Sequence, residues 1–319
     1  MSSPVYLHDH PDFAALVRIV ADEMNILPGL VEKDYWIMHV LFGLKEGGYI
    51  FELKGGTSLS KGYGIIDRFS EDIDIHIKPP ERFSINENPN NTKPANIEAR
   101  KNFYDWLATD IKLPGIVSQQ RDENFDDTKY YRSGGIRLLY NNVNDKVEGL
   151  KEGILLETGF DDVTPNTNIT ISSWAYDRAI RTKGIHLIDN RAKDIPCYHQ
   201  GYTFVEKLQT IATKYRKEQN GDTGRPNFMR QYYDVYSLLA DAEVLEFIGS
   251  KAYHEHKRKR FPSTDYEIPI MENEAFLLTD PVIKADFIKR YMETAALYYK
   301  GQPPFESLLE RIAQYMKVL

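Results

Sequence analysis

The sequence feature that most constrains the fold of this chain is the strict alternation of the segment Asp72–Ile77, DIDIHI. Successive side chains of a β-strand point to opposite faces of its sheet, so an isoleucine at every second position predicts a strand with one buried face. The opposite face of this strand carries Asp72, Asp74 and His76. The segment therefore predicts a strand that packs its isoleucines into a core and presents two neighbouring carboxylates on its other side.

The two aspartates of this strand are predicted to need a cation. Carboxylates that lie this close repel each other by about 1 to 4 kcal/mol, depending on the effective dielectric constant around them. Mg²⁺ removes that repulsion, because it binds one or two carboxylates together with water and substrate phosphates. The alternative is an exposed acidic face on an edge strand, since an isolated Asp-x-Asp sequence is common.

The segment Lys54–Ser58, KGGTS, shortly before the acidic strand has the composition of a phosphate-binding turn. It follows a predicted short strand, Tyr49–Leu53, and precedes a helix predicted to begin at Thr57 or Ser58. Glycines let a backbone approach phosphate oxygens closely, and free N–H groups at a helix start can cradle them together with hydroxyl groups. The alternative is a tight turn with a serine N-cap, and a Walker A loop is excluded because its second glycine and Lys-Ser/Thr are missing. The residues predicted to bind the nucleotide phosphates are Gly55, Gly56, Thr57 and Ser58.

A third carboxylate on a neighbouring strand would complete a site for two metal ions, and Glu157 is the candidate. Glu157 ends the apolar run Ile154–Leu156, whereas Asp161 and Asp162 follow Gly159 and are expected beyond the strand end. An ordinary acid at a strand end is the alternative reading of Glu157. Together these groups predict transfer of a nucleoside monophosphate from an NTP to an acceptor hydroxyl. One metal ion, with Glu157, would activate the hydroxyl, and a second would neutralise the leaving pyrophosphate.

The periodicity of the apolar residues changes near Tyr198 and divides the chain into two parts. Strands alternate with helices before this point, whereas helical spacing dominates after Gln200. The predicted fold class is α+β, with a mixed sheet flanked by helices in residues 1–198 and a helical C-terminal lobe in residues 199–319. Helices are predicted at Asp12–Met24, from Pro28 up to Gly47, and at Ile97–Ile111, Phe204–Tyr215, Phe228–Leu239, Ala242–Tyr253, Val282–Tyr299 and Phe305–Met316. Further strands are predicted at Ile136–Tyr140, Gly153–Thr158 and Ile169–Trp174. A loop is predicted at Pro79–Ala95.

Composition limits the partners and the compartment of the protein. Hydrophobic residues make up 42% and charged residues 27% of the 319 residues, a balance that supports a sizeable folded core. The net charge of −7 argues against a protein that coats nucleic acid non-specifically, but leaves room for one local basic patch. The single cysteine, Cys197, cannot form an internal disulfide, which predicts a cytoplasmic location. The sequence shows neither a signal peptide nor the roughly 20 apolar residues of a membrane span, so no membrane partner is expected.

Beyond these patterns, the segment Lys54–Ile75, KGGTSLSKGYGIIDRFSEDIDI, closely resembles the signature of the AbiEii/AbiGii nucleotidyltransferase toxins, a family of the DNA polymerase β-like superfamily. In the segment Arg230–Asp234 the family usually has an Arg-Asp pair before the later aspartate, whereas this chain has Gln231 after Arg230. This difference leaves a role for an acid at position 231 in doubt, but not the role of Asp234. The resemblance runs from about Glu32 to Leu239. Three further segments match the family's layout: Glu32–Trp36, Glu206–Leu208 and Arg230–Asp234.

The resemblance implies a polymerase β-like core, a helical lobe and an NTP as substrate. Some members of the family use tRNA 3′ ends as acceptor, so an RNA acceptor such as tRNA is expected here. The family also implies a toxin that a separate antitoxin protein neutralises. Carried over by position, Mg²⁺ (or Mn²⁺) would be bound by Asp72 and Asp74, the triphosphate would be contacted by Gly56, Ser58 and Lys207, and Asp234 would position Lys207 or the nucleotide.

Two alternatives to nucleotidyl transfer onto RNA remain open. The same core could attach a nucleotide to a protein hydroxyl. The chain could also be a catalytically silent module that binds a nucleotide and an antitoxin, although the presence of Asp72, Asp74 and Ser58 together favours an enzyme.

Several charged residues keep more than one interpretation. Lys207 fits a phosphate ligand or a surface lysine, and Arg68 fits a partner of Asp72, an anchor of the turn or a solvated residue. Asp234 stands among aromatic residues and needs a lysine or arginine partner if it is buried. Lys33 and Asp34 fit a surface ion pair or a support behind the site, and the basic run His254–Arg260 fits an RNA contact or a solvated helix end. The eight histidines show no zinc-ligand spacing.

Overall fold

The structure is a computed structural model that describes residues 3–145, 150–182, 184–224 and 226–319. The chain forms two compact units. The sheet unit consists of Met1–Gly62 and Phe69–Tyr198, and the helical unit consists of Tyr63–Arg68 and His199–Leu319. The short segment Tyr63–Arg68, between the glycine turn and the acidic strand, thus belongs to the helical unit. The division into domains at residues 1–198 and 199–319 stays a prediction.

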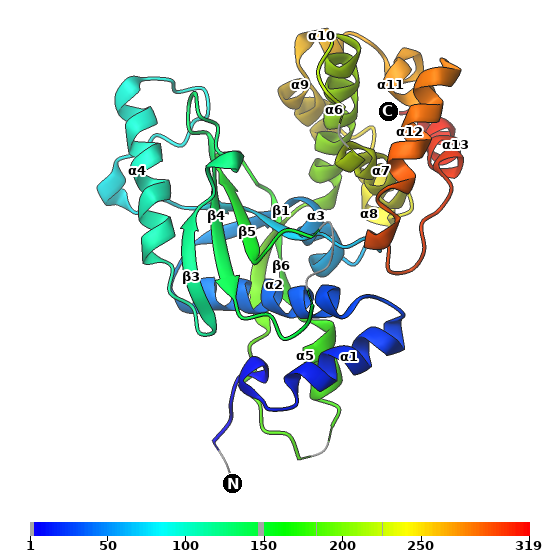
Figure 1. Cartoon of the computed structure of the whole chain (residues 1–319). Helices are drawn as coiled ribbons and strands as arrows, with labels where there is room; N and C mark the ends of the chain where they lie inside the picture. The colour runs from blue at the N-terminus through cyan, green and yellow to red at the C-terminus, as the bar shows by residue number, and fades with distance from the viewer. Residues whose placement is uncertain (1–2, 146–149, 183, 225) are drawn as a thin grey trace. The chain divides into compact units, whose positions relative to one another are not determined.

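A mixed seven-stranded sheet forms the centre of the sheet unit (Figure 1). Its strand order is β3-β4-β5-β2-β1-β7-β6. The acidic strand, β2, pairs in parallel with β5 and in antiparallel with β1, so it is a central strand and the edge-strand alternative is wrong. The strands are β1 (Phe51–Lys54), β2 (Asp72–Ile77), β3 (Ile116–Arg121), β4 (Ser133–Tyr140), β5 (Ile154–Gly159), β6 (Asn166–Ile171) and β7 (Ala192–Tyr198).

The alternation of β2 produces the predicted two-faced strand. Ile73, Ile75 and Ile77 expose at most 1% of their surface, whereas Asp72 and Asp74 on the opposite face are partly exposed. Thr158 of β5 pairs with both Ile75 and Gly134, so Gly134 lies on the same face of the sheet as the isoleucines. Tyr104, which belongs to a helix, packs on Gly134, so this face of the sheet is covered by helical structure. The carboxylates are therefore kept off the core side of the sheet.

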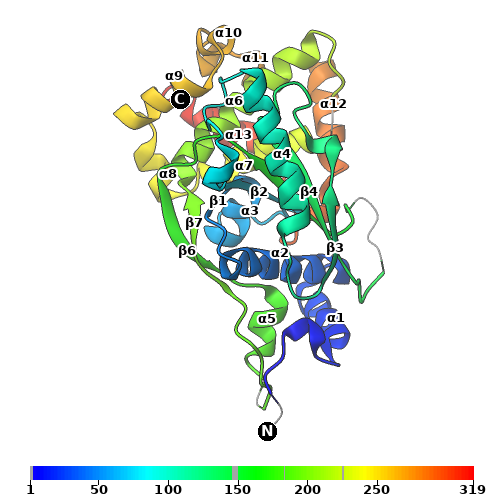
Figure 2. The same ribbon diagram turned by 90° about the vertical axis from the view of Figure 1, so that its left-hand side faces the viewer.

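Helix α2 is the most buried helix of the sheet unit. Residues Leu30–Leu41 are all buried, including the charged residues of this stretch. The helices α1 and α5 contact α2 on one side, and strand β7 contacts it on the other (Figures 1 and 2). A helix surrounded by protein on all sides must bury its polar residues too. The helices of this unit are α1 (Phe13–Met24), α2 (Pro28–Glu46), α3 (Gly55–Thr57), α4 (Pro94–Asp110) and α5 (Trp174–Ala179), with a π-helical turn at Ser58–Gly62.

The helical unit is built around α6, which contacts α7, α8, α9 and α11. The helix predicted from Ala242 to Tyr253 is broken into two, because Gly249 adopts a positive φ of 79° between them. The helices are α6 (Gln200–Gln219), α7 (Arg230–Leu238), α8 (Ala242–Phe247), α9 (Lys251–Arg260), α10 (Ser263–Tyr266), α11 (Glu274–Leu277), α12 (Pro281–Met292) and α13 (Phe305–Tyr315). Short 3-10 turns lie at Leu7–Asp9, Glu81–Phe83, Glu123–Phe125, Pro226–Met229, Ile270–Glu272 and Ala295–Leu297.

The predicted α+β fold with a helical C-terminal region is confirmed. Two strands escaped prediction, β3 and β7, and the helix after the predicted loop begins at Pro94 rather than at Ile97. Among the described residues, no helix combines the length and the apolar composition of a membrane span.

Candidate active site

The register of the sheet brings the predicted acidic residues together. Asp74 is paired with Lys54 of β1 on one side and with Glu157 of β5 on the other. Directly paired residues project their side chains to the same face of a sheet. Glu157 therefore shares one face with Asp72 and Asp74, and we call these three residues the acidic cluster.

The glycine turn after β1 packs directly on the acidic cluster. Helix α3 begins at Gly55, so the helix start predicted at Thr57 or Ser58 is wrong. Gly55 has a φ of 71°, and a Cβ atom at this position would lie 2.1 Å from Asp74 Oδ2. Only glycine allows this approach. The backbone of the turn and the carboxylate of Asp74 are thus immediate neighbours within one unit.

The two hydroxyl groups of the turn face the interior. Thr57 and Ser58 are both fully buried. The Thr57 hydroxyl donates a hydrogen bond to the backbone carbonyl of Asp72, so it fastens the turn to β2 rather than standing free for phosphate. Ser58 faces the Cys197 thiol, whose pKa is raised to about 12 by burial in spite of the Ser58 hydrogen bond. Cys197 is therefore an unreactive core thiol.

A lysine that the sequence did not predict lies on the acidic cluster. Lys151 Nζ forms an ion pair with Asp72 Oδ2 and lies 4.0 Å from Glu157 Oε1. Burial raises the pKa of Asp72, and the charge of Lys151 opposes this shift. The position of Lys151, shortly before β5 and outside any periodic pattern, gave no signal in the sequence.

The pKa of Glu157 is sensitive to the negative charge of the other two carboxylates in the cluster. Its pKa is raised to about 7, first by burial and then by the charges of Asp74 and Asp72. A carboxyl group with this pKa changes its protonation near neutral pH. It is therefore suited to proton transfer as well as to cation binding.

The donor set of the acidic cluster fits a hard divalent cation. Asp72 Oδ1 is buried and has no hydrogen-bond partner among the described residues. Two aspartates on one strand face, one of them with an unsatisfied oxygen, supply the carboxylate ligands that Mg²⁺ and Mn²⁺ use. No group of three or more His, Cys, Asp or Glu side chains in the described ranges is arranged as a metal site, so Glu157 as a third ligand stays a prediction.

The charged residues of α2 lie behind the acidic cluster. Lys33 and Asp34 expose 2% and 0% of their surface, so the reading as a surface ion pair is wrong. Lys33 Nζ pairs with Glu71 Oε2 at 3.4 Å, immediately before Asp72 in the chain. Asp34 Oδ1 pairs with Lys61 Nζ at 2.7 Å, at the end of the turn that follows α3. Both ends of the α3–β2 connection are therefore anchored to α2 by buried charges.

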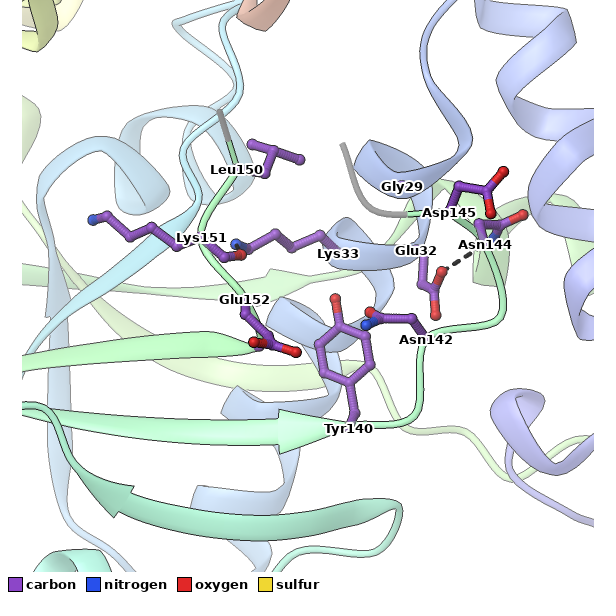
Figure 3. A pocket seen from close by; sticks show the side chains of 11 residues that line it. Gly29, Glu32, Lys33, Tyr140, Asn142, Asn144, Asp145, Leu150, Lys151 and Glu152 are labelled. Atoms are coloured by element: carbon purple, nitrogen blue, oxygen red, sulfur yellow. Dashed lines mark hydrogen bonds between the residues drawn. The ribbon is translucent and has the colours of Figure 1, made fainter. Parts of the chain in front are cut away.

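A polar pocket opens beside these residues, where α2 begins and β5 is about to start (Figure 3). Glu32 accepts hydrogen bonds from the Val143 backbone and the Asn144 side chain on its wall. Lys33 Nζ donates to the Lys151 carbonyl at 2.6 Å. The pocket is lined by Gly29, Glu32, Lys33, Tyr140, Asn142, Asn144, Asp145, Leu150, Lys151, Glu152 and Gly153.

A second charge cluster lies within the helical unit. Asp234 is fully buried and accepts two hydrogen bonds from Arg68, at 2.6 Å from Nε and 2.7 Å from Nη2. Lys207 Nζ lies 3.0 Å from Asp234 Oδ2. Burial pushes the pKa of Asp234 upward, but the charges of Arg68 and Lys207 outweigh it and leave the pKa below its ordinary value. The predicted cationic partner of Asp234 is thus present, in the form of both Arg68 and Lys207. Because Arg68 is buried and only 13% of the Lys207 side chain is exposed, neither of them is a solvated surface residue.

The basic run His254–Arg260 belongs to α9 and is partly engaged inside the helical unit. His256 is buried and lies 3.7 Å from Glu206, which also pairs with Arg260 at 3.4 Å. Lys257 donates to the carbonyl of Leu319. These contacts give several cations of the run a packing role inside the helical unit.

Comparison with known proteins gives one family match. Residues 39–311 match a family model described as "Nucleotidyl transferase AbiEii toxin, Type IV TA system". The matched range contains the acidic cluster, Lys207 and Asp234, whereas Lys33 and Asp34 precede it. No curated protein matches the chain.

Proposed function

Since the chain belongs to the AbiEii family of nucleotidyl transferase toxins of type IV toxin–antitoxin systems, we propose that its acidic cluster carries out a metal-dependent nucleotidyl transfer. The chain would transfer a nucleoside monophosphate from an NTP to an acceptor hydroxyl and release pyrophosphate. The observation that carries this proposal is the contact between Gly55 and the Asp74 carboxylate. This contact supports the proposal, because an NTP with its metal ion needs a backbone that can hold phosphate oxygens next to a carboxylate that can bind a cation.

The residues of the sheet unit receive the following roles. Asp72 and Asp74 hold Mg²⁺ or Mn²⁺, which would offset the negative charge of the phosphates during transfer. The backbone N–H groups of Gly55 and Gly56 hold phosphate oxygens. Glu157 accepts the proton of the acceptor hydroxyl. At the same time the hydroxyl oxygen forms a bond to the α-phosphorus of the NTP, and the bond from this phosphorus to the pyrophosphate oxygen breaks. The pKa of Glu157, about 7, supports this role.

Lys207 and Asp234 are proposed to serve the nucleotide phosphates from the helical unit. Asp234 holds the Lys207 ammonium at 3.0 Å and also binds Arg68, so two cations share one carboxylate. This surplus of positive charge supports an interaction with an anion. Asp234 acts as the positioning residue, and Lys207 acts as the phosphate contact.

The proposed acceptor is RNA, with a tRNA 3′ end as the favoured example, and the proposed biological partner is a cognate antitoxin protein in the cytoplasm. The family description, a toxin of a type IV toxin–antitoxin system, supports the antitoxin partner. The RNA acceptor rests on the sequence resemblance described above, and the cytoplasmic location rests on the single cysteine. Transfer to a protein hydroxyl uses the same cluster and is the second candidate. The presence of Asp72, Asp74 and Ser58 together disfavours a silent nucleotide-binding module.

Incubation of the full chain with each labelled NTP, Mg²⁺ and total RNA tests the proposal. We expect one NTP to label an RNA species, and the label should disappear after nuclease treatment. Label that survives the nuclease and migrates with protein would favour a protein acceptor. Absence of label on both RNA and protein, together with metal-independent nucleotide binding, would contradict the enzymatic proposal.

A further inference from the structure

Lys151 is held in place by its backbone. Its N–H donates a hydrogen bond to Glu71 Oε2 at 2.9 Å, and its carbonyl accepts one from Lys33 Nζ at 2.6 Å. Lys33 and Glu71 form an ion pair at 3.4 Å and expose only 3% and 7% of their side chains. Breaking such a buried pair leaves an uncompensated charge, so the pair fixes the backbone of Lys151 firmly.

The side chain of Lys151 ends on the acidic cluster through three contacts. Its ammonium binds Asp72 Oδ2, lies 4.0 Å from Glu157 Oε1 and lies 4.6 Å from the ring centroid of Phe125. An ammonium is attracted both to carboxylates and to the face of an aromatic ring. With its backbone clamped and its end held by three groups, Lys151 occupies a defined place in the site.

That place overlaps with the place of a metal ion. Asp72 offers two carboxylate oxygens, and the ammonium takes Oδ2 while Oδ1 stays buried without a hydrogen-bond partner in the described part of the chain. A divalent cation at Asp72 would stand within a few Å of the ammonium. Two positive charges at that separation repel each other, which weakens the binding of the second.

We propose that Lys151 and the divalent cation compete for Asp72, so that metal alone binds the nucleotide-free protein weakly. This inference rests on the proposed function, because it takes Asp72 and Asp74 as metal ligands. The negative charge of a bound triphosphate offsets the repulsion between the two cations. Metal binding therefore becomes coupled to nucleotide binding, and Lys151 is the residue that imposes the coupling.

Mn²⁺ binding to the nucleotide-free full chain, followed by the electron paramagnetic resonance signal of free Mn²⁺, tests the competition without any activity measurement. Lys151→Met should bind Mn²⁺ at least about tenfold more tightly than wild type, because a unit charge at this separation changes affinity by more than one tenfold step. Lys151→Gln gives the same test if Lys151→Met is unstable. Lys151→Arg keeps the charge and should retain the wild-type affinity.

A matched control separates this effect from the general loss of a positive charge. Lys45 lies in the same unit and donates hydrogen bonds to the β7 carbonyls of Lys193 and Asp194, at 2.6 and 3.0 Å. Lys45→Met should change Mn²⁺ affinity by less than about threefold. An equal gain in Lys45→Met and Lys151→Met would overturn the specific competition.

The possible failures are distinguishable. Unchanged or weaker Mn²⁺ binding by Lys151→Met, with binding that is still lost in Asp74→Asn, would refute the competition and leave the proposed metal site intact. Mn²⁺ binding that is insensitive to Asp72→Asn and Asp74→Asn would instead refute the metal assignment on which the proposed function depends. Absence of binding in wild type and in every Lys151 variant would refute both.

Discussion

The two charge clusters of this chain hold their carboxylates in opposite states. In the sheet unit, the three carboxylates of the acidic cluster share one face, and Lys151 forms an ion pair with Asp72. In the helical unit, the single carboxylate of Asp234 binds both Arg68 and Lys207. The pKa values of Asp72 and Glu157 are raised, whereas the pKa of Asp234 is lowered although it is fully buried.

The difference between the clusters lies in the balance of charge rather than in burial. A group of carboxylates with too few cations gains free energy when a cation is added. A single carboxylate with two cations is stable by itself and leaves positive charge for an anion. This contrast fits a metal site in the sheet unit and a phosphate contact in the helical unit. It also means that loss of an aspartate should harm activity in the first cluster and stability in the second.

The largest expected effect is the loss of nucleotidyl transfer in Asp74→Asn. A metal ion contributes several kcal/mol to such a transfer, and each 1.36 kcal/mol is a factor of ten. We therefore expect the rate to fall by about a thousandfold or more. Labelled-NTP transfer measures the rate, and calorimetry should show an unchanged or higher Tm because one repelling charge is gone.

Full transfer activity in Asp74→Asn would break the comparison, because the first cluster would then have no metal-dependent role. A lower Tm with normal activity in Asp74→Asn would show that the acidic cluster serves stability, which is the role that we assign to the cluster around Asp234.

Asp234→Asn should cost the largest amount of stability. The change leaves the buried Arg68 without its carboxylate, and breaking a buried ion pair in this way costs about 3 to 5 kcal/mol. Denaturant unfolding of the full chain measures the loss. The matched control is Asp222→Asn, at an exposed position of the same unit, which should change stability by less than about 0.5 kcal/mol. Equal stability of the two variants would contradict the account of this cluster.

Lys207→Met should have a smaller effect on stability and a clear effect on transfer. Arg68 keeps its two hydrogen bonds to Asp234, so we expect a loss of about 1 kcal/mol in unfolding free energy. A charge-assisted phosphate contact is worth about 1.5 to 3 kcal/mol, so transfer should fall by about ten- to a hundredfold. Lys214→Met on the same helix serves as the control. Equal transfer rates in the two variants would remove Lys207 from the catalytic residues.

The smallest expected effects are opposite pH dependences of stability. Because the pKa of Glu157 rises from an ordinary 4.5 to about 7, its stabilising contribution is complete below pH 4.5 and is lost as the pH rises through 7. Glu157→Gln should therefore become more stable relative to wild type above pH 7. Because the pKa of Asp234 is lowered from 3.8, its contribution is present above pH 3.8 and is lost as the pH falls through the lower value.

The Tm values of wild type, Glu157→Gln and Asp234→Asn, measured from acid to mildly alkaline pH without metal or nucleotide, check these signs. A difference between Asp234→Asn and wild type that closes near neutral pH, or a Glu157→Gln advantage that grows toward acid, would contradict the assignment.

The parts of the site that the sequence predicted are those encoded by a local pattern. The alternation of β2 predicted which side of the strand Asp72 and Asp74 occupy, because side-chain direction depends only on the strand period. The glycine turn was also predicted from a local pattern, the two glycines directly after a predicted strand, although its helix begins at Gly55 itself. The unpredicted strands lack such a pattern: β7 contains Pro196, and β3 is mostly polar.

The parts that the sequence did not predict depend on partners far apart in the chain. Arg68 and Asp234 are separated by 166 positions, and Lys151 and Asp72 by 79. No local pattern identifies which of many charged residues will meet after folding. For Lys33 and Asp34 the sequence left a surface ion pair and a support behind the site as alternatives, because charged residues are usually exposed. The first alternative is wrong, since α2 is covered by other elements and buries both residues.

The central claim is that the acidic cluster binds a metal ion and an NTP together. Binding of a non-hydrolysable NTP analogue to the full chain, measured by calorimetry with and without Mg²⁺, tests it most directly. The account predicts that wild type binds the analogue only with Mg²⁺ and that Asp72→Asn and Asp74→Asn lose this Mg²⁺-dependent binding. Analogue binding that is equally tight without Mg²⁺ and unaffected by either substitution would contradict it.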